Sequence, residues 1–134
     1  MSGYRVVRID DMEAIAFGTF KRARAELDVT AFGLQILDLP AGMDAYPEHD
    51  HSEDGQEEVY FVLRGGGEVE IEGERIPLDP ETAVSIKAGT RRKLWPGPDG
   101  LRIVAIGGKP GAVYETKAIS ELGAPDPYAP APAG

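Results

Sequence analysis

The sequence predicts an all-β protein made of short antiparallel strands. Apolar and polar residues alternate in several short segments, and glycine or proline separates these segments at regular intervals. This pattern indicates a sandwich or a closed barrel, because a parallel sheet would need long helical crossovers between its strands. A chain of 134 residues is long enough for one domain and too short for a second full core.

The N-terminal third is expected to contain two strands and one short helix. Residues 4–9 are predicted to form the first strand, and residues 30–39 the second, with apolar positions that alternate at first. Residues 20–27 contain good helix formers, and Thr19 is placed to cap them. The three cations of this helix are expected to form a solvated face.

Short strands and turns are predicted for the rest of the chain. The expected strands are 59–63, 68–72, 75–78, 83–86 and 101–106. Residues 65–67 and 96–100 are rich in glycine and proline and are expected to be turns. A tight hairpin is predicted at Gly73 and Glu74, and a short helix at 118–122.

The charge of the chain limits its partners. There are 23 acidic and 14 basic residues, which give a formal net charge of −9. The resulting field repels phosphate, so we expect no binding to nucleic acid or to anionic membranes. Cysteine is absent, which excludes disulfides and thiolate metal sites. No segment resembles a signal peptide or a membrane span, and a cytoplasmic location is the expectation.

The two histidines of the chain are His49 and His51, one residue apart. In a strand, alternate side chains point to the same face, so both imidazoles would project together. Glu58 follows and opens an apolar run that ends at glycines. Two histidines and one carboxylate form a facial triad that suits Fe(II), and the same ligand set suits catalytic zinc. The sequence therefore predicts a divalent metal site.

The spacing around these residues resembles the first motif of the cupins. That motif runs Gly, five residues, His-x-His, three or four residues, Glu, six residues, Gly. Here six residues separate Gly42 from His49, and six separate Glu58 from Gly65, whereas the loop between His51 and Glu58 is longer than in the family. The resemblance covers residues 30–107.

This resemblance implies a definite architecture. The expected fold is a double-stranded β-helix, the jelly-roll barrel of the cupins, with short helical segments. The barrel would lie within a single domain, residues 1–122, followed by a flexible Pro/Ala-rich tail, residues 123–134. The resemblance also implies that His49, His51 and Glu58 are the metal ligands.

The second cupin motif fits poorly, and its main departure concerns a metal ligand. The family pattern is Gly, five residues, Pro-x-Gly, two residues, His, three residues, Asn, and in this chain only Gly89 matches it. The final histidine is replaced by Arg92, a permanent cation that cannot coordinate a metal.

Two interpretations of Arg92 remain open. In the first, the three remaining ligands hold Fe, Mn, Ni or Zn, and Arg92 anchors a carboxylate or phosphate of the ligand. In the second, no metal binds, and Arg92 pairs with Glu58 in a pocket for a small anion. Tyr60 shares strand parity with Glu58 and is expected to line the pocket. Arg92, Tyr60 and Gln56 are the expected ligand-binding residues, and Glu57 or Gln56 is a candidate for an outer-shell role.

The function expected from these residues is a pocket for a small molecule. The resemblance implies an oxygenase or isomerase that acts on a small acidic substrate, and the alternative is a non-catalytic, metal-free anion binder. The catalytic residues and the substrate stay unassigned. A homodimer is expected, with residues 4–9 as a candidate for strand exchange and Val59, Phe61 and Leu63 on the face away from the pocket.

Overall fold

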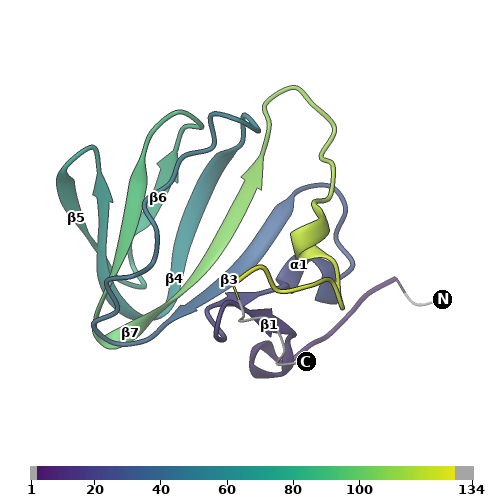
Figure 1. Ribbon diagram of the computed structural model, residues 1–134, viewed down its shortest axis with the longest axis horizontal. Coiled ribbons are helices and arrows are strands. Elements are labelled where there is room, and N and C mark those ends of the chain that lie inside the picture. Colours follow the sequence, from purple (N-terminus) through teal and green to yellow (C-terminus); the bar gives the residue numbers. More distant parts are fainter. Residues whose placement is uncertain (1–2, 129–134) are drawn as a thin grey trace.

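The computed structural model describes residues 3–128, and an antiparallel sheet accounts for most of its regular structure, as predicted. Its strands are β1 (Ala14–Ile15), β2 (Phe20–Lys21), β3 (Gly33–Leu39), β4 (Glu57–Ile71), β5 (Glu74–Leu78), β6 (Ala83–Ile86) and β7 (Arg92–Gly108). The helical elements are α1 (Ala23–Glu26) and two single 3-10 turns at Ile9–Asp11 and Ala118–Ser120. The strand order is β1-β2-β3-β7-β4-β5, and β6 pairs with residues 58–61 of β4, along the edge that faces away from β7 (Figure 1).

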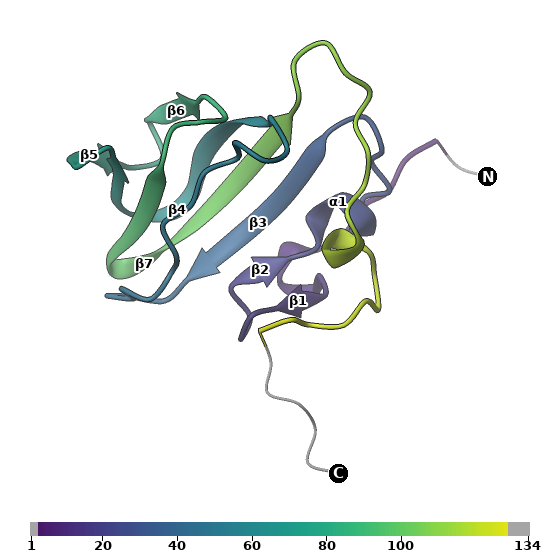
Figure 2. The same cartoon turned by 45° about the horizontal axis from the view of Figure 1, so that its top comes forward.

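Two long strands, β4 and β7, pass through both layers of the barrel. Residues 57–62 of β4 pair with residues 103–108 of β7, next to β3 and β6. Residues 67–71 of β4 pair with residues 92–96 of β7, next to β5. Figure 2 shows the curvature of both strands between these two regions. The same pair of strands therefore supplies the centre of each layer.

The bend of β4 explains why two predicted turns are wrong. The glycines at 65–67 lie inside β4, and residues 96–100 lie inside β7. The pairing shifts register between Val62 and Arg64 and again between Gly65 and Gly67. A Cβ atom at Gly67 would overlap the carbonyl oxygen of Trp95, so only glycine allows the two backbones to approach this closely. Glycine here bends a continuous strand and does not end it.

The main core lies between the two layers. Its buried residues come from all of the longer strands: Leu37, Leu39, Tyr60, Val62, Val69, Leu78, Ile86, Leu94, Leu101, Ile103 and Ala105. A smaller cluster of Met12, Ala23 and Ile36 packs on the opposite face of β3. Alternation along β3 sends Leu37 and Leu39 into the barrel and Ile36 outward, as a period of two requires.

The N-terminal region differs from the prediction. Residues 4–9 form no strand, and the helix covers only Ala23–Glu26, because residues 20 and 21 pair with β3. Thr19 donates its hydroxyl to the carbonyl oxygen of Ala16 and caps no helix. Sheet pairing has overridden the local helix propensity of residues 20–27. The hairpin after β4 also turns one residue early, at Glu72 and Gly73.

The expected solvated face of the helix is wrong as well. Lys21, Arg22 and Arg24 are all buried. Arg22 is 1% exposed and donates to the carbonyl oxygens of Ile119 at 2.8 Å and Ala124 at 2.9 Å. Arg22 and Arg24, which donates to Ser120 and Glu121, hold the C-terminal segment against the N-terminal elements, whereas Lys21 forms an ion pair with Asp38.

The C-terminal segment packs along this region as far as the structure describes it. The N–H of Gly123 donates to the carboxylate of Glu13, and the N–H of Ala16 donates to Asp126 at 2.9 Å. The helix predicted for 118–122 is a single 3-10 turn. Residues 129–134 of the predicted tail lie outside the described residues. Within 3–128, no helix has the length and apolar character that a membrane crossing requires.

Candidate metal centre

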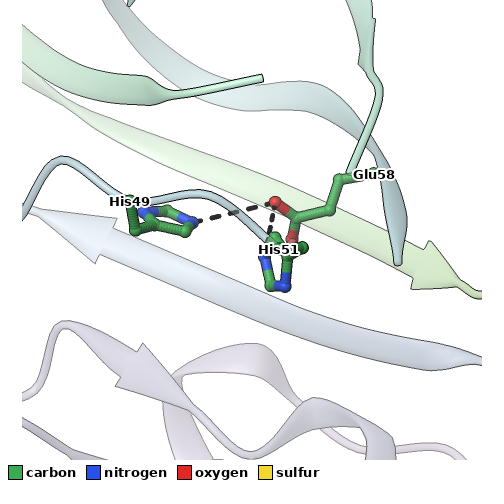
Figure 3. A group of neighbouring side chains, drawn as sticks. All are labelled: His49, His51 and Glu58. Atoms are coloured by element: carbon green, nitrogen blue, oxygen red, sulfur yellow. Dashed lines mark ion pairs between the residues drawn. The ribbon is translucent and has the colours of Figure 1, made fainter. Parts of the chain in front are cut away.

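Backbone pairing holds the segment that carries both histidines. His49 and Arg92 exchange two backbone hydrogen bonds, each 2.9 Å long, which bridge this segment to the start of β7. The N–H of His51 donates to the carbonyl oxygen of Ala88 at 2.7 Å. Glu58 is the second residue of β4. The two histidines do not form a regular strand, yet both rings face Glu58 (Figure 3).

One carboxylate oxygen, Oε1 of Glu58, lies at the centre of this group. It is 3.1 Å from Nε2 of His51 and 3.8 Å from Nε2 of His49, and it accepts the hydroxyl of Tyr60 at 3.0 Å. One ligand atom from each of His49, His51 and Glu58 lies within 4.8 Å of the other two. The Glu58 side chain is 9% exposed and that of His49 is 31% exposed, so the group approaches the surface beside His49.

Each imidazole is held through its Nδ1 atom. Nδ1 of His51 lies 3.1 Å from Oδ2 of Asp54, and Nδ1 of His49 lies 3.3 Å from the carbonyl oxygen of Pro47. Both partners only accept, so in the neutral rings each Nδ1 carries the proton and each Nε2 carries the lone pair. Nε2 of His51 is buried and has no hydrogen-bond partner within residues 3–128, although Glu58 is close.

Asp54 is the outer-shell residue that the sequence did not reveal. Its carboxylate accepts from His51, from the backbone N–H of Gln56 at 3.0 Å and from the ammonium of Lys117. Burial raises the pKa of Asp54, but its hydrogen bonds to Lys117, Gln56 and His51 outweigh burial and lower this pKa to about 2. Asp54 is therefore charged at neutral pH and orients the His51 ring, as carboxylates do behind metal-ligating histidines.

The electrostatics of the site keep Glu58 ionised. Burial raises the pKa of the Glu58 carboxyl, but contacts with His49 and His51 and the charge of Arg92 together hold it well below its usual range. The contact with Glu58 raises the pKa of His51, and Asp54 adds to this effect. The carboxylate is thus ready to act as an anionic ligand, and it attracts positive charge to Nε2 of His51.

Two tyrosines border the carboxylate. Tyr60, predicted to line the pocket, is 1% exposed and donates to Glu58. Burial, followed by the negative charge of Glu58, raises the pKa of Tyr60 and of Tyr46. Both phenols therefore stay protonated. The ring of Tyr46 packs edge-on against that of His49, with 6.4 Å between the ring centroids. The sequence did not predict that Tyr46 lies beside the site.

Arg92 lies behind the carboxylate with no hydrogen bond from its side chain. The residue is 0% exposed, and Nη2 is 3.6 Å from Oε1 of Glu58. None of its three guanidinium nitrogens has a hydrogen-bond partner in the described part of the chain. The ion pair with Glu58 is the contact that the metal-free interpretation expects. The guanidinium nitrogens make no hydrogen bond among the described residues, so they are also available to anchor a ligand, as the metal-binding interpretation expects.

Gln56 supplies none of the three ligand atoms. It lines a surface pocket of about 380 Å³ together with Asp54, Lys109, Tyr114 and Lys117. Its backbone N–H supports Asp54, which is an outer-shell contact, but its side chain has no hydrogen bond to the histidines among those of the described residues. Of the predicted site residues, the structure brings together His49, His51, Glu58, Tyr60 and Arg92, and the side chain of Gln56 makes no hydrogen bond to them within the described residues.

The donor set fits a divalent metal. In the neutral tautomers, two imidazole nitrogens with lone pairs and one ionised carboxylate converge, and the carboxylate of Asp54 orients the ring of His51. In the neutral ring, the lone pair of His51 Nε2 faces the carboxylate of Glu58 across 3.1 Å, and either a metal ion or a proton at this place would satisfy both atoms. The group can therefore hold a metal ion. The class of protein defined by the fold and the site is an antiparallel β-barrel with a His-His-Glu group that can bind a metal.

Comparisons with known proteins agree with that class. The cupin domain family model matches residues 35–107, more than half of the chain, and the chain belongs to this family. No curated protein sequence matches the chain.

Solved structures show the same fold. A cupin protein from Bacteroides fragilis is similar at 24% identity and a TM-score of 0.66, over 87% of this chain and 93% of that one. A protein from Planctomyces limnophilus is 23% identical with a TM-score of 0.60, over 81% and 90% of the two chains. A protein from Photorhabdus luminescens is 14% identical with a TM-score of 0.61, over 82% and 90%. These similarities establish the barrel and no activity.

Proposed function

We propose that this cupin binds a divalent metal through His49, His51 and Glu58 and acts on a small acidic molecule, as an oxygenase or isomerase. The observation that carries the proposal is the buried Nε2 of His51, which has no hydrogen-bond partner within 3–128 while Nδ1 is held by Asp54. A metal ligand needs this tautomer and this orientation.

The protein's own groups would prepare the site. Asp54 keeps the proton of His51 on Nδ1, and the charges around Glu58 keep its carboxylate ionised. Tyr60 and Tyr46 stay protonated near the carboxylate. Fe, Mn, Ni or Zn suits the donor set, and such a metal supplies a Lewis acid or, for iron, a centre that activates dioxygen.

A second candidate function is a metal-free cupin that binds a small anion. It is favoured by the position of Arg92, whose charge lies 3.6 Å from Glu58 and partly occupies the electrostatic role that a metal would have. In this alternative the ion pair replaces the metal, and Arg92 provides the donors for the anion. The two candidates differ in whether transition metal binds at His51.

Metal analysis of protein purified without a histidine tag tests the proposal. After incubation with Fe(II), Mn(II), Ni(II) or Zn(II) and removal of the excess, about one equivalent should remain bound, and the His51→Ala variant should retain none. Less than about a tenth of an equivalent of every metal would reject the metal site and favour the anion binder. Circular dichroism of the variant checks that it stays folded.

We also propose that the protein is a homodimer. Phe61 and Leu63 lie on the outer face of β4 and are 47% and 44% exposed, which supports a partner on this side of the sheet. Exchange of residues 4–9 has no support, because these residues form no strand. Solution scattering should give twice the monomer mass of 14.4 kDa, and a monomeric mass would reject the dimer.

A further inference from the structure

The guanidinium of Arg92 is a buried charge that faces the proposed metal ligands. Its side chain is 0% exposed, and its three nitrogens have no hydrogen-bond partner among residues 3–128. The backbone bridge to His49 fixes the residue at this place, at the first position of β7. A buried cation whose donors make no hydrogen bond is costly even beside a carboxylate, so the presence of Arg92 next to a metal site calls for a physical explanation.

The charges of the site balance before any metal arrives. With neutral imidazoles, the carboxylate of Glu58 and the guanidinium of Arg92 compensate each other across 3.6 Å. Among the neighbouring charges, Asp54 contacts Lys117, and Arg91 contacts both Glu48 at 2.8 Å and Asp50 at 3.8 Å, where exposure to water screens their charges. A divalent cation would therefore add two uncompensated positive charges to a poorly hydrated site. Such an excess is strongly unfavourable where the local dielectric constant is low.

We propose that Arg92 makes metal binding conditional on a small carboxylate anion that enters the same site. This inference rests on the metal site proposed above and adds the chemical class of its second occupant. The anion removes part of the excess positive charge, so the metal and the anion each raise the affinity of the site for the other. A histidine at position 92 would add a neutral ligand, whereas arginine adds a charge that demands an anion.

The chemistry of Arg92 favours a carboxylate as this anion. A guanidinium offers planar, paired donors that match the two oxygens of a carboxylate, and all three of its nitrogens are free in the described structure. The partly exposed side of the group at His49 is where an anion can approach.

Calorimetric titration with Zn(II) and acetate tests this inference in the wild-type protein. Acetate should lower the Kd for Zn(II) by a factor in the range of about 5 to 150, which is typical of coupled sites. Linkage requires Zn(II) to raise the affinity for acetate by the same factor. Sodium chloride at matched ionic strength is the control for screening, and the weak Zn(II)–acetate complex in solution is included in the fit.

The Arg92→Met variant separates charge from packing. It should bind Zn(II) more tightly than the wild type in the absence of acetate, and the effect of acetate should fall to about the level seen with chloride. The Arg92→Lys variant keeps the charge and should keep the coupling. If Arg92→Met does not fold, as judged by circular dichroism, the Kd for Zn(II) of the wild type with acetate, compared with its Kd with chloride, still decides whether metal binding is conditional on a carboxylate.

The possible failures are distinguishable. Zn(II) binding that is lost in His51→Ala but has the same Kd with and without acetate would leave the metal site intact and overturn the role of Arg92. Coupling that persists unchanged in Arg92→Met would also overturn it. If neither the wild type nor Arg92→Met binds Zn(II) at any acetate concentration, the proposed metal site and this inference fail together.

Discussion

Asp54 holds the imidazole of His51 through a 3.1 Å contact to Nδ1, and Nε2 of the same ring faces Glu58. Lys117, 63 residues further along the chain, contacts the same carboxylate of Asp54. A line of charged and polar contacts thus runs from the C-terminal segment to the proposed metal ligands. This line extends the site well beyond the residues that would touch a metal.

The first prediction concerns this outer shell. Asp54→Asn should weaken metal binding by about 10- to 100-fold, because the neutral amide is a poorer partner for the Nδ1 proton and weakens His51 as a donor. Zn(II) titration measures the effect. Glu53→Gln, an exposed carboxylate of the same loop, should leave the Kd unchanged. Equal affinities for Asp54→Asn and wild type would show that Asp54 does not support the metal site.

The second prediction concerns the bend of β4. Gly67→Ala should destabilise the protein by about 3 kcal/mol, since the new methyl group would overlap the backbone of β7 at Trp95. Gly108→Ala is the matched control, because it lies in β7 and a Cβ atom there meets no atom within 4 Å. Urea denaturation gives both values. Similar free energies of unfolding for the two variants would contradict the close approach of the strands.

The third prediction concerns the buried cation that holds the C-terminal segment. Arg22→Met should cost about 3 kcal/mol of stability, because it leaves the carbonyl oxygens of Ile119 and Ala124 without this donor and removes the ion-pair partner of Glu13. Thermal unfolding measures the loss. Arg5→Met is the control, since its ion pair is exposed and contributes at most about 1 kcal/mol. A loss no larger than that of the control would be inconsistent with the clamp.

The fourth prediction concerns pH. The paired hydrogen bonds from Arg102 lower the pKa of Asp38 below its usual value of 3.8, with distances of 3.0 and 2.7 Å. A carboxyl whose pKa is lower in the folded state stabilises the fold above its unfolded pKa, and this contribution disappears as the pH falls through the folded value. Asp38→Asn should therefore cost about 2 kcal/mol at pH 7 and progressively less below about pH 4.

Denaturation of wild type and Asp38→Asn between pH 7 and pH 2.5 measures this difference. Glu81→Gln serves as the control, because Glu81 is exposed and has no ion pair among the described residues. Its effect should stay small at every pH. A cost of Asp38→Asn that is independent of pH would mean that the charge of Asp38 is not what stabilises the contact with Arg102.

The grouping of His49, His51 and Glu58 could be predicted because the chain has only two histidines and their spacing has a physical meaning. The role of Asp54 could not. It lies among other acids of one loop, and what selects it is the loop backbone together with Lys117, which is distant in sequence. A carboxylate three residues after a candidate ligand histidine was the local signal available.

The strands were predictable from alternation, but their continuity was not. Glycines at 65–67 favour a turn in any local interpretation, and only the pairing of β4 with β7 shows that the chain bends there and continues. The N-terminal helix fails for a related reason, because residues 20–21 find partners in β3 that propensity does not include. Local sequence patterns predict short strands and helices, whereas the bend of β4 and the pairing of residues 20–21 depend on contacts between distant segments.

The passage of β4 and β7 through both layers has a mechanical consequence. The two layers share β4 and β7, so a force that pulls the layers apart acts along covalent backbone and not only across side-chain packing. Cutting the chain within 65–67 and 96–100 would sever both connections at once, and the region around β5 would then be held through β6, which pairs with residues 58–61 of β4, through the backbone bridge between His49 and Arg92, and through the shared core. The barrel should therefore open as one unit, and the ligand-bearing end cannot loosen independently of the far end.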